Sequence, residues 1–128
     1  NYPSAMKVIE GTNIFNFYIN KNLFINSLDK ALIFSNDETS TVTLTLNANE
    51  MTVFSQDIDK GALNEKLVIK GNIKEEIKVV LNVNKLLILL KNIANEEVLF
   101  ELSSNITPIL LKNPKNSDYV SLILPARR

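Results

Sequence analysis

Alternating and helical hydrophobic patterns follow one another twice along this chain. The segments Phe15-Asn-Phe-Tyr-Ile-Asn20 and Ile77-Lys-Val-Val-Leu-Asn82 place apolar residues at alternate positions, which predicts two half-buried strands. After each strand, apolar residues recur at i, i+1 and i+4, which predicts a helix with one face on a core. These residues are Phe24, Ile25 and Leu28 in the first run and Leu86, Leu87 and Leu90 in the second.

Three further strands are predicted after each helix. They cover Thr41–Leu46, Met51–Ser55 and Leu63–Lys70 in the first half, and Val98–Leu102, Ile109–Lys112 and Tyr119–Leu124 in the second. The halves therefore repeat one unit of strand, helix and three strands, with the leading strands and helices 62 residues apart. Because one unit is too small to bury both a helix face and a sheet face, we expect the two units to share one core.

The predicted fold class is α+β, with two helices packed on antiparallel sheets in a single domain over residues 1–128. A hydrophobic content of 45% is enough for one sizeable core. We assign residues 1–12 to an interdomain linker and lead-in, 13–70 to the first repeat and 75–128 to the second. The start at Asn1 rather than methionine is interpreted as the mark of a piece of a longer protein.

Composition argues against catalytic and metal chemistry. The chain has no histidine and no cysteine, so it lacks the commonest general base and the thiolates of disulfides and metal sites. None of the three glycines belongs to a phosphate-binding loop. The carboxylate pairs Asp57 with Asp59 and Glu75 with Glu76 are interpreted as solvated loop charges. We expect no enzyme activity, no metal and no cofactor.

Charge is balanced, with fourteen basic and fourteen acidic residues, so no global field attracts nucleic acid or anionic lipid. Any contact with DNA must be local or weak. No apolar run approaches the roughly 20 residues of a membrane span, and no signal peptide is visible. A cytoplasmic protein without membrane contact is the simplest expectation.

Two features indicate binding to a partner. Pro125 ends the last strand because it has no N–H, so the final residues are expected to lie on the surface beside that strand. The alternative is a core strand with a frayed basic tail. At the end of the first helix the buried stripe is already filled, which leaves at least one of Ile33 and Phe34 off it. Exposed apolar residues there indicate a partner surface, unless the following loop covers them.

Together, in this order and on this repeat, the motifs resemble the C-terminal third domain of the bacterial sliding clamp, the β subunit of DNA polymerase III. The closing run Leu122–Arg127, Leu-Ile-Leu-Pro-Ala-Arg, is similar to the family's last residues. The run Asn82–Leu86 resembles the start of its second helix, Lys30–Glu38 resembles the end of its first, and Pro108 stands where many clamps have a proline. The resemblance covers essentially the whole chain.

The resemblance implies a DNA clamp, or processivity, fold. Three residues depart from the family's pattern: Lys85 replaces an aromatic residue, Ala126 a larger apolar residue and Arg128 a final leucine or isoleucine. All three lie on the predicted surface, so the departures affect the shape and depth of a pocket rather than the fold.

In clamps of this family, two three-domain chains join head to tail, and their helices line a hole through which duplex DNA slides whatever its sequence. The implied function is therefore that of a non-catalytic processivity factor in cytoplasmic DNA replication. A neutral protein suffices, because enclosure replaces tight phosphate contacts. The implied DNA-facing residues, which are otherwise a solvated surface, are Asn22, Asn26, Lys30, Lys91 and Asn92.

The resemblance also implies a groove beside the last strand that accepts a Gln-Leu-x-Leu-Phe peptide from polymerase, clamp-loader and repair proteins. Apolar burial would come from Val8, Leu122 and Leu124, and Asn82 with Arg127 would bond the peptide. In the family, part of this pocket belongs to the preceding domain. The implied lining is Pro3, Lys7, Val8, Thr39, Asn82, Lys85, Ile106, Pro108, Leu122, Ile123, Leu124, Pro125, Ala126 and Arg127.

The implied contacts to the other subunit of the homodimer are Ile33, Phe34 and Lys66, with the strand Leu63–Lys70 as a pairing edge. Alone, the chain is expected to be monomeric with some tendency to self-associate. Two other functions stay open. A small enzyme would need an acid, base or metal cluster on the folded surface. A non-clamp β-rich interaction module with no DNA role would lack a pocket at Leu122–Arg127.

Overall fold

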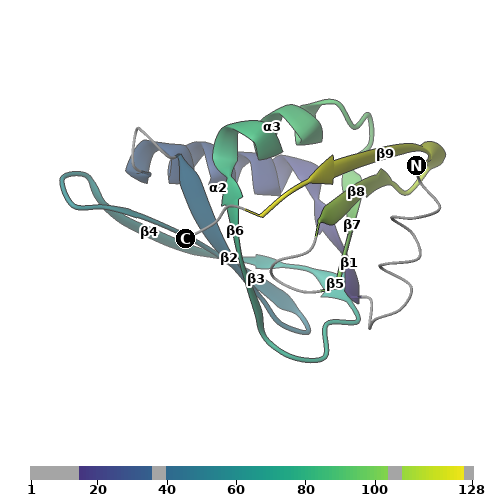
Figure 1. Cartoon of the computed structure of the whole chain (residues 1–128), viewed down its shortest axis with the longest axis horizontal. Coiled ribbons are helices and arrows are strands. Elements are labelled where there is room, and N and C mark those ends of the chain that lie inside the picture. The colour runs from purple at the N-terminus through teal and green to yellow at the C-terminus, as the bar shows by residue number, and fades with distance from the viewer. Residues whose placement is uncertain (1–14, 36–39, 104–107, 126–128) are drawn as a thin grey trace.

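A computed structural model describes residues 15–35, 40–103 and 108–125, without the side chains of residues 117 and 118 (Figure 1). Its elements run strand, helix and three strands twice, so the predicted duplicated unit and α+β fold class are confirmed. One short extra strand, β5, links the two units. In chain order the elements are β1 (Phe15–Asn20), α2 (Lys21–Phe34), β2 (Thr41–Leu46), β3 (Glu50–Asp57), β4 (Gly61–Val68), β5 (Lys70–Gly71), β6 (Ile77–Asn82), α3 (Val83–Lys91), β7 (Glu97–Leu102), β8 (Ile109–Asn113) and β9 (Asn116–Ile123).

Each unit gives its first strand to the sheet of the other unit. One antiparallel sheet has the order β5-β1-β7-β8-β9 and the other β4-β3-β2-β6, so β1 pairs with β7 and β6 pairs with β2. The same backbone bond follows both exchanged strands, from the N–H of Lys21 to the carbonyl of Glu96 and from Val83 to Ser40, each at 2.7 Å. Neither sheet is complete without the other half of the chain, which makes the two units interdependent.

The two aligned asparagines cap the two helices. The side-chain oxygen of Asn20 accepts the N–H of Leu23 at 3.0 Å, and that of Asn82 accepts the N–H of Lys85 at 2.9 Å. An asparagine at this position supplies an acceptor for one of the N–H groups that a helix start leaves unpaired. The repeat seen in the sequence is thus a repeat of capping as well as of hydrophobic pattern.

Buried side chains from both units form one cluster, which confirms the shared core. The rings of Phe17 and Phe100 stack with centroids 5.0 Å apart, and Phe24 meets Phe100 edge-on at 5.8 Å. Phe17 and Phe24 belong to the first unit and Phe100 to the second, so this aromatic contact joins the repeats. Offset and edge-on ring pairs add to the stabilisation from burial alone.

The prediction of one strand over Leu63–Lys70 is wrong at its C-terminal end. β4 ends at Val68, Ile69 is buried, and β5 lies in the other sheet beside β1. A Cβ on Gly71 would fall only 2.1 Å from the carbonyl oxygen of Asn16. Only glycine permits this approach of β5 to β1. A hydrophobic pattern does not show where the chain passes from one sheet to the other, so the break between β4 and β5 was not predicted.

The two helices lie side by side along one face of the molecule, the upper face in Figure 1. α2 has 14 residues and α3 has 9, so α2 extends about one and a half turns further than its counterpart. Ile33 and Phe34 lie in this extension. In the described part of the chain, neither helix is long and apolar enough to cross a membrane.

Candidate functional site

A hollow of about 310 Å³, here called the α3–β9 groove, lies between α3 and the end of β9. One wall comes from the helix and the other from the strand and the residue after it. Five of the six lining side chains are aliphatic and one is a lysine, so the groove offers apolar surface with a single charge. The lining residues are Lys85, Ile88, Leu89, Leu122, Ile123 and Leu124.

Helical spacing explains the first wall. Ile88 and Leu89 follow Lys85 by three and four residues, which places the three side chains on one side of α3. Leu89 is half-buried against the core, whereas Ile88 is 62% exposed. Ile88 therefore adds exposed apolar surface to this wall of the groove.

Strand alternation and a proline explain the second wall. Ile123 points into the core, while Leu122 and Leu124 on either side of it are 48% and 64% exposed. Pairing of β9 with β8 ends where Ile123 faces Ile109. Pro125 has no N–H to continue the ladder, so Leu124 lies beyond the sheet at the mouth of the groove.

The structure brings together four of the predicted groove residues, namely Lys85, Leu122, Ile123 and Leu124. Asn82 caps α3 one turn before Lys85, Pro125 is half-buried next to Leu124, and Pro108 precedes β8 without lining the groove. Sequence reasoning missed Ile88 and Leu89, although helical spacing from Lys85 would have found both. The other predicted residues, Pro3, Lys7, Val8, Thr39, Ile106, Ala126 and Arg127, lie outside the described part of the chain.

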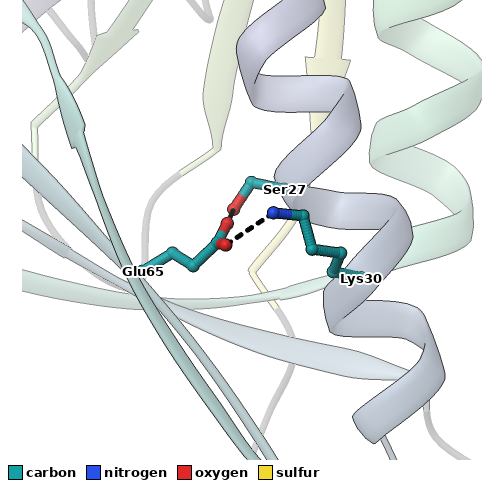
Figure 2. Close-up of polar contacts among 3 residues, drawn as sticks. All are labelled: Ser27, Lys30 and Glu65. Carbon is teal, nitrogen blue, oxygen red and sulfur yellow. Dashed lines mark hydrogen bonds and ion pairs between the residues drawn. The ribbon is translucent and has the colours of Figure 1, made fainter.

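A polar cluster of Ser27, Lys30 and Glu65, here called the Glu65 clasp, ties α2 to β4 (Figure 2). The hydroxyl of Ser27 donates to Oε1 of Glu65 at 2.8 Å, and Nζ of Lys30 donates to Oε2 at 2.6 Å. Both oxygens of the carboxylate are therefore satisfied by the helix. This contact was not predicted from the sequence, where Lys30 is expected on an open DNA-facing surface.

The Glu65 clasp changes the acidity of its carboxyl. The Lys30 ammonium, followed by the Ser27 hydroxyl, holds the pKa of the Glu65 carboxyl below its ordinary value of 4.5, while partial burial acts in the opposite direction. Hydrogen bonds to the charged form favour that form. The carboxylate is accordingly ionised at neutral pH and fixes the edge strand to the helix.

The residues predicted to contact the other subunit lie at the C-terminal end of α2 and on β4. Ile33 is 64% exposed. The ring of Phe34 lies close to Gly61, 3.9 Å from where a Cβ added to that glycine would stand. The prediction that at least one of the two apolar side chains leaves the buried stripe is therefore correct. Lys66 is exposed on β4, which is an edge strand of the four-stranded sheet.

All five predicted DNA-facing residues are at least partly exposed on the two helices or at their ends, namely Asn22, Asn26, Lys30, Lys91 and Asn92. The Lys30 ammonium is paired with Glu65, so its charge is partly neutralised. Asn92 ends α3, where its N–H donates to the carbonyls of Leu89 and Leu90.

Polar side chains away from the groove make local structural contacts. Oδ2 of Asp57 accepts the N–H groups of Asp59 at 3.0 Å and Lys60 at 3.3 Å, an arrangement that shapes the turn before β4. The hydroxyl of Ser35 donates to the carbonyl of Leu32 at 3.0 Å. Within the described ranges, no three His, Cys, Asp or Glu side chains gather as a metal site would require.

Solved sliding clamps have the same fold. The chain is 20% identical to a Pseudomonas aeruginosa DNA polymerase sliding clamp with a TM-score of 0.87, covering 100% of this chain and 35% of that one. A DnaN sliding clamp from Bartonella birtlesii, solved bound to griselimycin, is 23% identical with a TM-score of 0.86, covering 100% and 34%. For the C. crescentus beta sliding clamp, the identity is 20%, the TM-score 0.87 and the coverage 100% and 34%.

This chain spans about a third of the length of those clamps. No curated protein matches its sequence. The family described as DNA polymerase III beta subunit, C-terminal domain, matches residues 10–127, which include every described helix and strand. The chain therefore belongs to the family formed by the C-terminal domains of the DNA polymerase III β subunit.

Proposed function

We propose that this chain is the third domain of a ring-shaped sliding clamp that encircles duplex DNA and makes the replicative polymerase processive. Membership of the β-subunit family supports this proposal, and so does the arrangement of two adjacent helices backed by two antiparallel sheets. In such a ring the domain has a non-catalytic role and works in the cytoplasm. Its chemistry is binding alone.

The α3–β9 groove is the proposed docking site for short peptides of the Gln-Leu-x-Leu-Phe kind from polymerase, clamp-loader and repair proteins. The observation that carries this proposal is the meeting of aliphatic residues from α3 and β9 around one open hollow. A peptide's leucine and phenylalanine would bury apolar surface against Ile88, Leu122 and Leu124. Anchors of this type supply most of the affinity in peptide recognition. Pro3, Lys7, Val8, Thr39, Ile106, Ala126 and Arg127 are proposed to extend the lining.

An NMR titration of the ¹⁵N-labelled chain tests the docking proposal. A blocked Gln-Leu-Asp-Leu-Phe peptide should give saturable shifts centred on Lys85, Ile88, Leu122 and Leu124. The control peptide replaces both leucines and the phenylalanine with alanine, which removes the anchors and should remove the shifts. Equal shifts with both peptides, or no shifts at all, would contradict a docking role for this groove.

The polar sides of α2 and α3 are proposed to face DNA, through Asn22, Asn26, Lys30, Lys91 and Asn92. The chain has no net charge, and the Lys30 ammonium is paired, so the direct attraction to phosphates is weak. We expect no measurable binding of the isolated chain to a short duplex at physiological salt in fluorescence anisotropy. Tight binding would argue for a conventional DNA-binding domain instead of a clamp.

The subunit interface is proposed to include Ile33, Phe34 and Lys66, with β4 as the strand that pairs across it. Ile33 is open, and β4 is an edge strand. Intact clamps of this kind would be head-to-tail homodimers in which the complementary surface belongs to the first domain, whereas residues 10–127 match the C-terminal domain. Sedimentation velocity should show a monomer, and a tight dimer at micromolar concentration would contradict the assignment.

A further inference from the structure

Lys85 is the charged member of the α3–β9 groove, and its side chain is exposed at the rim. Among the described residues, its ammonium group takes part in no hydrogen bond or ion pair. Lys30 and Lys112 pair with glutamates, and Lys21 donates to the carbonyl of Ile93 at 2.6 Å. Several exposed lysines in the segments that the structure describes resemble Lys85 in having no such partner, but Lys85 is the lysine that lines the groove. Lys85 therefore has a charge available for a ligand.

The position of Lys85 in α3 is unfavourable for a cation. It is the third residue of the helix, and the first turn contains no acidic residue. The N-terminal end of a helix carries a partial positive charge, so a lysine there is repelled, whereas an anion is stabilised. In the first repeat the aligned residue is the neutral Leu23. A side chain that breaks a local rule without a partner is typical of a functional position.

We propose that Lys85 makes the α3–β9 groove selective for peptides that carry a carboxylate beside their apolar anchors. This inference rests on the proposed docking function. The carboxylate would pair with Nζ of Lys85 and lie near the positive end of α3, while Ile88, Leu122 and Leu124 hold the anchors. Because the rim is exposed, solvent screens the pair, and the expected preference over a neutral peptide is about two- to fivefold.

Three end-blocked peptides test the proposal by fluorescence anisotropy at low salt. Gln-Leu-Asp-Leu-Phe and Glu-Leu-Asn-Leu-Phe carry a carboxylate at different places, and Gln-Leu-Asn-Leu-Phe is the neutral reference. The unmodified chain should bind at least one acidic peptide about two- to fivefold more tightly than the reference. Lys85→Gln should abolish that preference, so that the acidic and neutral peptides bind the variant with equal affinity. Higher salt should reduce the preference in the unmodified chain.

The control variant is Lys74→Gln, which removes a charge from an exposed lysine between β5 and β6 and should keep the preference intact. Equal affinities for all three peptides would overturn the role of Lys85 while leaving the docking function in place. A preference that persists in Lys85→Gln would do the same. Failure of every peptide to bind would overturn the docking function and this inference together.

Discussion

The two repeats differ where each helix meets the edge strand of its sheet. The two units can be aligned strand by strand through their paired residues, starting from β1 in one unit and β6 in the other. In this alignment Glu65 of β4 corresponds to Ser121 of β9. The 62-residue offset aligns Ser27 of α2 with Leu89 of α3. Where the first junction has a serine donating to a carboxylate, the second therefore has a leucine and a serine at the aligned positions. One junction is closed by the Glu65 clasp, and the other leaves the α3–β9 groove.

The aligned side chains of the second junction form no counterpart of the clasp. Leu89 has no polar side-chain atom and packs on the core, and the hydroxyl of Ser121 donates to the hydroxyl of Tyr119 on its own strand at 2.9 Å. Ile88 and Leu122 stay open beside them. The two units therefore share the helix caps and the core residues on which folding depends. They differ at the helix–strand junctions, where substitutions leave the fold intact and can serve separate functions.

The largest expected effect comes from a substitution at Gly71, just after the chain crosses from β4 to β5. Gly71→Ala would place a Cβ 2.1 Å from the Asn16 carbonyl oxygen and 2.7 Å from Cα of Phe17, so β5 must move away from β1. We expect the free energy of unfolding to fall by about 1–3 kcal/mol, the usual cost of overpacking. Urea unfolding measures it.

The matched control is Lys70→Ala, which changes the neighbouring, exposed residue of β5 and should stay within about 0.5 kcal/mol of the unmodified chain. If Gly71→Ala is as stable as the control, the close approach of β5 to β1 does not anchor the end of β4.

The open junction should be sensitive in binding rather than in stability. Leu124→Asp places a charge at the mouth of the α3–β9 groove, and we expect about tenfold weaker peptide binding or worse, because an apolar anchor site is lost. Since Leu124 is 64% exposed, the unfolding free energy should barely change. Anisotropy with a fluorescent Gln-Leu-Asp-Leu-Phe peptide measures the loss.

Val68→Asp is the control for that substitution, since Val68 is the aligned residue at the other junction and is 76% exposed. It should leave peptide affinity unchanged. Equal losses of affinity in the two variants would mean that the peptide does not bind specifically at the second junction and that binding responds only to added negative charge.

Much of this frame was predictable from the sequence because local patterns encode it. The alternating strands, the helical stripes and the capping asparagines, Asn20 and Asn82, all act within a few residues. The turn of β4 into β5 was not predictable, because the reason for Gly71 is a strand 55 residues away, at Asn16. The exchange of first strands between sheets is likewise a long-range property.

The candidate groove was predicted in part, from the proline that ends the last strand and from the resemblance to a family. Lys85, Leu122, Ile123 and Leu124 lie in motifs that resemble those of the family, whereas Ile88 and Leu89 are identified by their helical spacing from Lys85. The Glu65 clasp was invisible because Ser27 and Glu65 are 38 residues apart and neither residue type signals burial. A polar contact between a helix and a strand far away in the sequence depends on the folded arrangement and leaves no local sequence pattern.

A smaller effect is expected from breaking the closed junction. Glu65→Gln keeps an acceptor for Ser27 but removes the ion pair with Lys30, whose side chain is 54% exposed. We expect a loss of about 0.5–1 kcal/mol in the free energy of unfolding. Hydrogen exchange should show faster opening of β4 amides and unchanged β9 amides, because only the first junction depends on the clasp.

The control for Glu65→Gln is Glu101→Gln, which breaks the Glu101–Lys112 pair between two strands, with a separation of 2.9 Å and similar exposure of the carboxylate. It should cost a comparable amount without loosening β4. If both variants accelerate hydrogen exchange of the β4 amides equally, the Glu65 clasp does not specifically stabilise that strand.

The smallest effect is the pH dependence of the closed junction. The folded-state pKa of the Glu65 carboxyl lies below its ordinary value of 4.5, chiefly because of Lys30. The stabilisation is therefore complete above that ordinary value and is lost as the pH falls through the lower, folded-state pKa. Urea unfolding between neutral pH and pH 3 should show the unmodified chain and Glu65→Gln converging in acid. In Lys30→Met most of this pH-dependent difference should vanish, since the largest cause of the shift is gone; a difference that persists undiminished would assign the effect to Ser27 instead.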